Sequence, residues 1–233
     1  IEEKKSDQDM IKEFSKKANI DVTKVLADCM NTNNVSNMQS IRNQIEKKIK
    51  SSNLSSETKT EFKDTLTKLT NTNFGTVNEN SVLNLYCNKY NKVATKTDKF
   101  IRKKLFADDI HTWYIGGKVD GITEDKILIE IKNRMYKLFY KVRDYEMIQI
   151  QTYLKLLNLN KAHLIECLKK DNKEINIIEI NYDNNYWNNI ILERIVKFTR
   201  FFNSFMKDDE LKFFMLLDKK ENIYNKLNEI YNV

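Results

Sequence analysis

Proline is absent from this 233-residue sequence and glycine occurs only four times, whereas lysine and asparagine are abundant. We interpret this composition as the codon bias of an A/T-rich genome and not as a structural signal. The scarcity of the two residues therefore gives no information about the fold.

Cysteine is also scarce, and the three cysteines, Cys29, Cys87 and Cys167, lie far apart in the sequence. Their spacing does not fit a zinc site, whose ligands usually come in closely spaced pairs. Three cysteines are also too few for an iron–sulfur cluster with four thiolate ligands. We therefore expect three reduced thiols and an intracellular, reducing compartment.

Long apolar runs are missing as well. No segment approaches the length of a membrane span, and the N-terminus has no signal-peptide pattern. The chain begins at Ile1 and not at methionine, so we expect a processed or truncated form, and the sequence leaves open whether a targeting segment is missing.

The overall composition is that of a globular protein, with 41% hydrophobic and 31% charged residues. The length is sufficient for one domain with a substantial core. The net charge of +7 and the pI of about 9.0 suit a polyanionic partner such as nucleic acid.

The strongest local pattern is a predicted β-hairpin. The segments 119–123 and 127–132 are rich in β-branched and apolar residues, and the polar residues Glu124–Lys126 between them suit a turn. A three-residue loop places Asp120 directly opposite Glu130. Opposed residues have Cβ atoms about 4.5–5.5 Å apart, so the pattern predicts two adjacent carboxylates.

Two carboxylates this close repel each other unless a cation lies between them. A hard cation such as Mg²⁺, which prefers oxygen ligands, would make the arrangement favourable. Because strand side chains alternate, Lys132 lies on the same face as Glu130, and the isoleucines of 127–132 point the other way. Lys132 is then placed to stabilise charge on a phosphate or to orient and deprotonate an attacking water.

The register of the hairpin decides this interpretation. A two-residue loop would move Asp120 opposite Ile129 and separate the carboxylates. The alternative is an ordinary surface hairpin, in which Asp120-Gly121 is part of a turn and Glu130 and Lys132 form a solvated face.

Further motifs lie between residues 74 and 205 on either side of the hairpin. In chain order they are Phe74-Gly75-Thr76-Val77-Asn78-Glu79 with Leu85-Tyr86, Val119-Asp120-Gly121, Glu130-Ile131-Lys132, Gln149-Ile150-Gln151-Thr152-Tyr153, the strand-like segments 162–168 and 175–181, and a helix containing Trp187. In this order the sequence resembles the PD-(D/E)XK nuclease superfamily and, within it, the lambda-exonuclease-like (YqaJ-type) branch. The glutamine motif also resembles the Gln-x-x-x-Tyr of RecB-type nucleases.

The resemblance implies a divalent metal site. Asp120, Glu130 and the carbonyl of Ile131 would bind Mg²⁺ or Mn²⁺, and Glu79 would be an additional ligand of metal or water. The expected cofactor is therefore Mg²⁺ or Mn²⁺.

Other positions follow the family pattern to different degrees. Lys132 matches the catalytic lysine, and Gln149 is expected to orient the water or a phosphate oxygen. Val119 stands where the family usually has proline, which leaves the ligating carboxylate in place. The serine and arginine that hold a 5′-phosphate in lambda-type enzymes have no clear match near the N-terminus, where Ser40 and Arg42 are no more than candidates, so the resemblance does not define end specificity.

Basic and aromatic side chains alternate in the segment that follows the hairpin, which suits backbone contacts and base stacking. The predicted nucleic-acid contacts are Arg134, Tyr136, Lys137, Arg143, Gln151 and Tyr153. The alternative is a surface loop with ordinary packing aromatics.

The predicted fold is α/β, with a central mixed β-sheet flanked by helices (a restriction-endonuclease-like core) and an α-helical N-terminal part. We place the helical part at residues 1–70 and the nuclease core at 71–233, and we expect the two to form one compact unit. The helices are expected at 8–18, 21–30, 38–50, 57–70, 74–90, 144–157, 186–206 and 209–231, with Asn73 as a break, and strands at 111–117, 119–123, 127–132, 162–168 and 175–181.

By resemblance, the expected function is a metal-dependent DNA exonuclease that acts on DNA ends in recombination, repair or replication. The alternatives are an endonuclease or RNA nuclease on the same core, and a non-catalytic DNA-binding protein. Lambda exonuclease is a ring-shaped trimer, so an oligomer is expected by family analogy only. Nucleus, cytoplasm, a viral replication site and a DNA-containing organelle are not distinguished.

Overall fold

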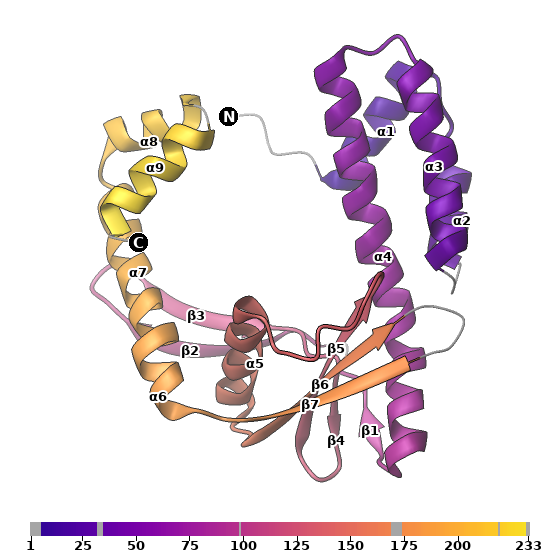
Figure 1. Cartoon of the computed structure of the whole chain (residues 1–233). Coiled ribbons are helices and arrows are strands. Elements are labelled where there is room, and N and C mark those ends of the chain that lie inside the picture. Colours follow the sequence, from indigo (N-terminus) through magenta and orange to yellow (C-terminus); the bar gives the residue numbers. More distant parts are fainter. Residues whose placement is uncertain (1–5, 32–34, 98, 169–173, 219, 232–233) are drawn as a thin grey trace. The chain divides into compact units, whose positions relative to one another are not determined.

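The computed structural model describes residues 6–31, 35–97, 99–168, 174–218 and 220–231. It shows a mixed α/β fold with a central mixed sheet flanked by helices and a helical N-terminal part (Figure 1), which confirms the predicted fold class. The chain forms two compact units, one with residues 1–98, 119–142 and 162–180, the other with residues 99–118, 143–161 and 181–233. No helix of the described residues is long and apolar enough to cross a membrane.

The first unit contains four helices and a five-stranded sheet. The helices are α1 (Asp7–Ala18), α2 (Thr23–Asn31), α3 (Val35–Ser51) and α4 (Ser56–Tyr90). The strands are β1 (Ala94–Thr95), β4 (Gly121–Thr123), β5 (Ile127–Arg134), β6 (Lys161–Leu168) and β7 (Glu174–Asn181), in the spatial order β1-β4-β5-β6-β7.

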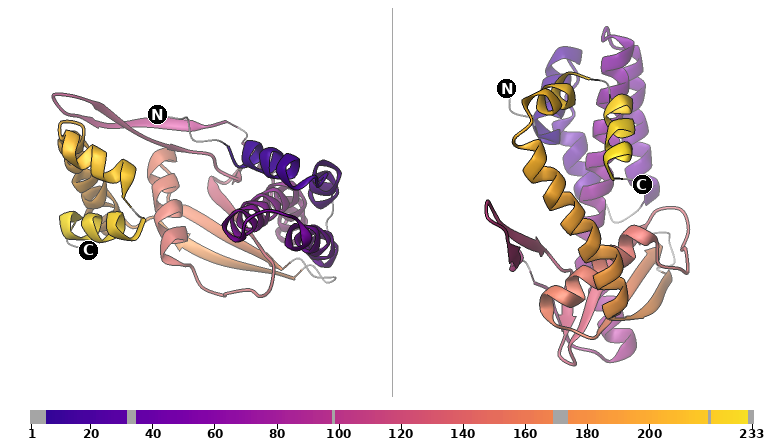
Figure 2. Two further views of the ribbon diagram at one scale, coloured as in Figure 1. Left: turned by 90° about the horizontal axis from the view of Figure 1, so that it is seen from above. Right: turned by 90° about the vertical axis from the view of Figure 1, so that its left-hand side faces the viewer.

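Helix α4 connects the helical N-terminal part to the sheet (Figure 1 and Figure 2). Its first half packs against α1–α3 around a core that includes Phe14, Phe62 and Leu66. The N-terminus of α4 is capped by Ser55, whose side chain accepts a hydrogen bond from the amide of Thr58. The predicted domain boundary after residue 70 therefore falls inside a helix.

The predicted break at Asn73 is wrong, because α4 continues through it. Phe74 is buried against Cys29 and Met38, and the Asn78 side chain donates a hydrogen bond to the Phe74 carbonyl. These tertiary contacts outweigh the low helix propensity of the Asn-Thr-Asn sequence before Phe74.

The hairpin β4–β5 has the predicted register. Gly121 pairs with Ile129 and Ile122 pairs with Leu128 in an antiparallel ladder. Lys126 adopts φ = 60° at the end of the turn, and its amide donates to the carbonyl of Thr123. A left-handed last residue is typical of three-residue hairpin loops, and this loop length sets the register.

The isoleucines of β5 face α4, as the alternation predicts. Ile127, Ile129 and Ile131 pack with Val82, Leu83 and Tyr86 of that helix and with Ile165 and Cys167 of β6. The side chain of Val77 lies outside the described part of the chain. The opposite face of β5 is also buried at Leu128 and Glu130, so the strand lies in the interior.

The second unit contains the hairpin β2 (Ile101–Ala107) and β3 (Thr112–Gly117), helix α5 (Asp144–Leu157) and the C-terminal helices. The latter are α6 (Asn184–Tyr186), a π-helical segment (Trp187–Leu192), α7 (Glu193–Phe205), α8 (Asp209–Leu217) and α9 (Lys220–Tyr231). Helix α5 has both predicted ends, whereas strand β2 was not predicted. The expected helix 209–231 ends at Leu217 and a second one begins at Lys220, with residue 219 outside the described residues.

Candidate active site

The hairpin brings the two predicted carboxylates together. Continuing the ladder by one residue from Gly121 and Ile129 places Asp120 opposite Glu130. The Asp120 carboxylate accepts a hydrogen bond of 2.7 Å from the main-chain amide of Ile131. Asp120 is thereby fixed beside the residue whose carbonyl is the third predicted metal ligand.

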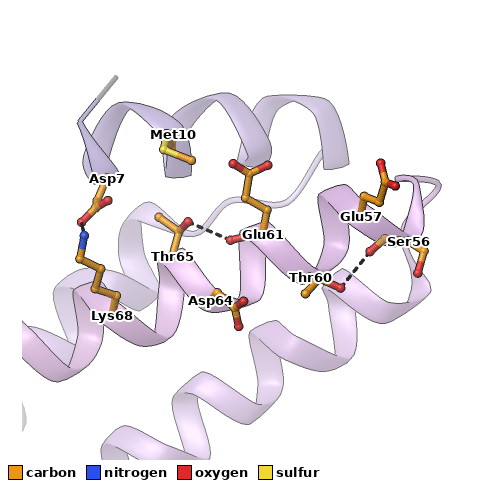
Figure 3. A pocket seen from close by; sticks show the side chains of 9 residues that line it. All are labelled: Asp7, Met10, Ser56, Glu57, Thr60, Glu61, Asp64, Thr65 and Lys68. Carbon is orange, nitrogen blue, oxygen red and sulfur yellow. Dashed lines mark hydrogen bonds and ion pairs between the residues drawn. The ribbon is translucent and has the colours of Figure 1, made fainter. Parts of the chain in front are cut away.

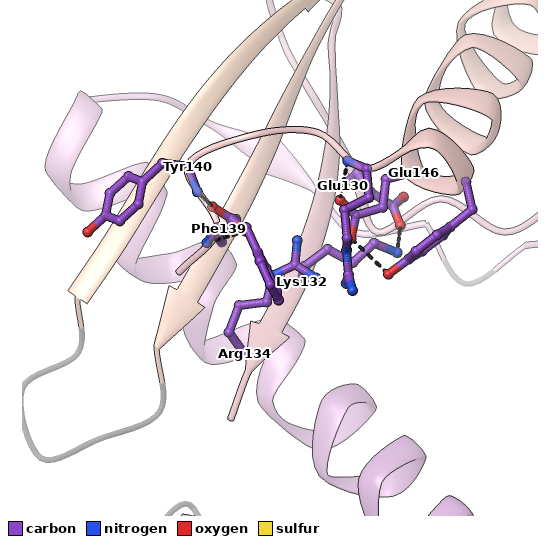
Figure 4. Close-up of polar contacts among 9 residues, drawn as sticks. Glu130, Lys132, Arg134, Phe139, Tyr140 and Glu146 are labelled. Atoms are coloured by element: carbon purple, nitrogen blue, oxygen red, sulfur yellow. Dashed lines mark hydrogen bonds and ion pairs between the residues drawn. The ribbon is translucent and has the colours of Figure 1, made fainter. Parts of the chain in front are cut away.

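Glu130 is almost completely buried, with 2% of its surface exposed. Its Oε1 accepts a hydrogen bond of 2.7 Å from Lys132 Nζ (Figure 4). Its Oε2 is buried, and no hydrogen-bond donor of the described residues reaches it. The pKa of Glu130 is raised to about 7: burial is the main cause, the charges of Asp120 and Glu79 also raise it, and Lys132 lowers it.

A buried carboxylate oxygen without a donor is energetically costly. Two opposed carboxylates and a nearby main-chain carbonyl are the oxygen ligands that Mg²⁺ and Mn²⁺ prefer. No group of three or more His, Cys, Asp and Glu side chains in the described residues is arranged to hold a metal. The predicted donor set, Asp120, Glu130 and the Ile131 carbonyl with Glu79 as a nearby charge, stays a prediction.

Lys96 is a site residue that the sequence did not indicate. It follows the two-residue strand β1, and its Nζ lies 3.2 Å from the Glu79 carboxylate, with both side chains about four-fifths buried. Strand β1 pairs with β4, next to the Asp120 turn. A two-residue strand is too short for a recognisable sequence period, so only the fold places Lys96 here.

Asn133 links the strand of the site to α4. Its side-chain amide donates a hydrogen bond of 2.9 Å to the carbonyl of Gly75, one helical turn before Glu79. This contact fixes the position of the Glu79 turn relative to Lys132 on β5.

Arg134, a predicted nucleic-acid contact, is buried and has a protein partner. Arg134 is 6% exposed, and its Nε donates a hydrogen bond of 2.8 Å to the fully buried carboxylate of Glu166 (Figure 4). Glu166 also accepts from the amides of Phe139 and Tyr140 and from the side chain of Asn176. Arg134 therefore belongs to a buried network that holds the segment after β5.

The two other contacts predicted in this segment of the first unit are on the surface. Tyr136 is 68% exposed, and Lys137 is exposed with its Nζ 6.0 Å from the ring centre of Phe139. Both residues are accessible, and their role in binding nucleic acid stays a prediction.

In the second unit, Gln149 and Tyr153 share a face of α5, as predicted, with Gln149 Nε2 3.3 Å from Tyr153 Oη. The Tyr153 ring lies against Gly117, where a Cβ atom would collide with it. Gly117 thus fixes the ring position. The roles of Gln149 and Tyr153 toward substrate stay predictions.

Gln151, another predicted nucleic-acid contact, is buried and has main-chain partners. Gln151 is 2% exposed, and its amide group donates to the carbonyl of Asn181 and accepts from the amide of Asp183. These main-chain contacts use the whole side-chain amide to join α5 to the segment 181–183.

Arg143 is only partly available. Its guanidinium donates to the buried carboxylate of Glu146 and stacks on the Tyr145 ring at 4.7 Å. About one third of the Arg143 side chain is exposed, so a phosphate contact stays a prediction.

Arg42, a candidate for a 5′-phosphate contact, has protein partners. Its Nε lies 3.6 Å from the Glu46 carboxylate, its Nη1 donates to Asn71, and 13% of the side chain is exposed. Ser40 is exposed on the same helix, α3. Arg42 therefore contributes to the packing of α3 on α4.

A pocket of about 690 Å³ lies between α1 and α4 (Figure 3). Four carboxylates line it, and one of them, Asp7, pairs with Lys68. They are Asp7, Glu57, Glu61 and Asp64. An acidic lining does not suit nucleic acid, and none of the predicted site residues lies in this pocket.

Comparisons with known proteins give low similarity. No family model matches the sequence, and no curated protein does. Among solved structures, an alkaline exonuclease (LHK-Exo) from Laribacter hongkongensis has a TM-score of 0.44 at 15% identity, covering 87% of this chain and 91% of that chain. The same enzyme in complex with dAMP gives 0.43 at 16% identity, with 81% and 88% covered.

A third solved structure, of SSO0001, has a TM-score of 0.40 at 17% identity, covering 78% of this chain and 79% of that chain. All three TM-scores lie below 0.5. The geometry of the site, and not these likenesses, therefore carries the functional interpretation.

Proposed function

We propose that the protein is a Mg²⁺- or Mn²⁺-dependent nuclease that hydrolyses DNA from its ends. The observation that carries the proposal is the buried Glu130 carboxylate, whose Oε2 has no donor in the described residues and which lies opposite Asp120. Burying two neighbouring carboxylates is unfavourable without a cation. A divalent ion between them would cancel the repulsion and would give the Glu130 Oε2 atom a partner.

Three residues of the hairpin would hold the ion. Asp120 and Glu130 supply carboxylate oxygens, and the Ile131 carbonyl supplies a neutral one. When bound, such an ion lowers the pKa of a coordinated water and stabilises the negative charge that develops on phosphorus. The hydrogen bond from the Ile131 amide keeps Asp120 in place for this task.

Lys132 lies between the Glu130 carboxylate and solvent, where a cation can act on the substrate. Its ammonium group contacts Glu130 and is 22% exposed, so it lies at the border between the buried carboxylate and solvent. From there it orients the attacking water or stabilises a phosphate oxygen. Glu79 adds negative charge on the side of α4.

The net charge of the chain and the exposed residues after the site strand favour DNA as the substrate. The net charge of +7 attracts a polyanion, and the exposed Tyr136 and Lys137 follow the strand that carries Glu130 and Lys132. The preference for DNA ends, and the role in recombination, repair or replication, rest on the sequence resemblance to lambda-type exonucleases.

The test is the degradation of linear and closed-circular duplex DNA in Mg²⁺ or Mn²⁺. Loss of linear DNA alone, abolished by EDTA and by Lys132→Ala but not by Lys89→Ala on the exposed face of α4, is the expected result. Labelling each strand end reports the polarity.

Other outcomes identify the alternatives. Cleavage of circles indicates an endonuclease, and cleavage of RNA alone indicates an RNA nuclease. Binding of DNA without cleavage of any nucleic acid in either metal would overturn the enzymatic proposal in favour of a binding protein.

A further inference from the structure

The hairpin β2–β3 in the second unit has a solvent-exposed face that combines positive charge with aromatic rings. Arg102 pairs with Gly116 across the two strands, and Lys104 pairs with Tyr114, so these four residues lie on one face. Arg102, Lys104 and Tyr114 are all exposed. We call these residues, together with Phe100, the outer face of the ribbon.

The positive charges of the outer face are not neutralised. Within the described part of the chain, no carboxylate forms an ion pair with Arg102 or Lys104, or with Lys103 between them. Lysines elsewhere in the chain are paired, for example Lys92 with Asp125 and Lys68 with Asp7. Arg102 and Lys104 on the outer face, with Lys103 on the opposite face of the same strand, favour a polyanion as the partner of the ribbon.

The aromatic residues of the outer face are held in defined positions. The Arg102 guanidinium stacks on the Tyr114 ring at 4.6 Å, which orders the arginine while its edge remains free to bind an anion. The Phe100 ring lies against Gly116, where a Cβ atom would approach it to 2.7 Å. Glycine thus makes room for a ring that is nevertheless 69% exposed.

An exposed phenylalanine next to two exposed cations, one of them held by a stacked ring, matches what a nucleic-acid strand requires. Cations spaced along the ribbon contact phosphates, and an aromatic face stacks with an unpaired base. A packing role accounts less well for Phe100, because two thirds of its surface remains in water.

We propose that the outer face of the β2–β3 ribbon binds a single strand of DNA, with Arg102 and Lys104 on phosphates and Phe100 stacked on a base. This inference rests on the proposed function for the choice of DNA as the nucleic acid. It assigns a DNA contact surface in addition to the carboxylate hairpin, built from residues that the sequence did not indicate.

The test is equilibrium binding of a fluorescent single-stranded oligonucleotide in EDTA, measured by anisotropy over a range of salt concentrations. Each phosphate contact on a single strand contributes about 0.7 to the slope of log K against log salt concentration. Arg102→Ala with Lys104→Ala should therefore reduce the slope by roughly 1.4. The matched control, Lys47→Ala with Lys48→Ala on the exposed face of α3, removes the same charge and should leave the slope unchanged.

Phe100→Ala should weaken binding at every salt concentration without changing the slope, by at least roughly fivefold for the loss of one stacked base. Its control is Phe213→Ala, an equally exposed ring on α8, which should bind like the unmodified protein. Circular dichroism and thermal midpoints verify that all four variants are folded.

Two results would overturn the proposal. One is an unchanged salt slope in the Arg102/Lys104 variant, and the other is an equal loss in the Lys47/Lys48 control. Because binding is measured in EDTA, it does not depend on catalysis. If the protein binds DNA through the ribbon but does not cleave it, the proposed function is disproved and the proposed binding surface is still supported.

Discussion

Glu130 is the residue at which burial and charge are most strongly opposed. Its carboxylate is enclosed by the sheet, faces Asp120, and is contacted by Lys132 on one oxygen only among the described residues. Replacing the Glu130 carboxylate by an amide of the same shape separates the effect of its charge on stability from its effect on metal-dependent cleavage.

Glu130→Gln should remove Mg²⁺-dependent cleavage and at the same time stabilise the metal-free protein. At pH 8 the amide avoids the burial of a negative charge beside Asp120, a gain on the order of 1 kcal/mol or about 2–4 °C in the thermal midpoint. The measurement is a thermal melt in EDTA and in Mg²⁺. The unmodified protein should gain stability from Mg²⁺ and the variant should not.

Glu124→Gln is the matched control, because Glu124 lies in the exposed turn of the same hairpin. It should behave like the unmodified protein in both buffers. An Mg²⁺-dependent rise of the melting temperature in Glu130→Gln would exclude Glu130 as a ligand.

Lys96→Met should increase the affinity of the site for Mn²⁺. The lysine neutralises Glu79 and repels a divalent cation nearby, so its removal should tighten binding by a few fold, as expected for loss of an ion pair worth about 0.5–1 kcal/mol. Calorimetric titration with Mn²⁺ in the absence of DNA measures this. Lys92→Met, which removes the partner of Asp125 in the hairpin turn, is the control, and an equal effect there would contradict the prediction.

At the scale of elements, the segment that follows β5 is held by a buried ion pair. Arg134→Ala would leave the Glu166 carboxylate buried without its cation, so we expect a loss of about 3–5 kcal/mol in the free energy of unfolding. Urea denaturation measures this loss. Lys137→Ala, a change of an exposed cation in the same segment, should cost less than about 0.5 kcal/mol.

A different result would restore the sequence-based interpretation of Arg134. If Arg134→Ala kept its stability and lost DNA affinity, the residue would contact nucleic acid after all. The buried network around Glu166 makes this the less favourable outcome.

The contact of α4 with β6 has a pH dependence. Tyr86 Oη lies 2.8 Å from His163 Nδ1, and burial of the phenol raises the pKa of Tyr86 from its usual 10 to about 12. The folded state therefore holds the proton more tightly than the unfolded state. The stabilisation is fully present below pH 10 and is lost as the pH rises through 12.

Tyr86→Phe should accordingly lower the stability at pH 9, by about 1 kcal/mol for the lost hydrogen bond. It should also show a smaller decline than the unmodified protein between pH 10 and 12. Urea titrations of both proteins at several pH values give the two slopes. Parallel curves would mean that Tyr86 titrates normally.

At the scale of the whole molecule, the chain passes between the two compact units five times, after residues 98, 118, 142, 161 and 180. Neither unit is a continuous segment, so neither can form from one part of the chain alone. We therefore expect one cooperative unfolding transition.

The chain carries separate probes for the two units. Trp113 and Trp187 lie in the second unit, whereas Cys29, Cys87 and Cys167 are free thiols in the first. Tryptophan fluorescence and the reaction of the thiols with a colorimetric reagent should therefore give the same urea midpoint. Two distinct midpoints would show that the units unfold independently.

The sequence by itself determined the parts of this protein that depend on neighbouring residues. The loop Glu124–Lys126 and the β-branched segments around it fixed the register that places Asp120 opposite Glu130, and the predicted ends of α5 were correct. Alternation along β5 correctly predicted that its isoleucines share one face. Loop length, strand alternation and helix period are local properties, so a sequence is sufficient to predict them.

Only the tertiary structure decided which residues far apart in the sequence come into contact and which of them become buried. Arg134, an expected DNA contact, is buried against Glu166, and Gln151, another, is buried against the segment 181–183. Burial of Phe74 carried α4 through its expected break, and pairing of β1 with β4 brought Lys96 to Glu79. The free energy of these contacts comes from burial and charge pairing across long sequence separations, which no local pattern encodes.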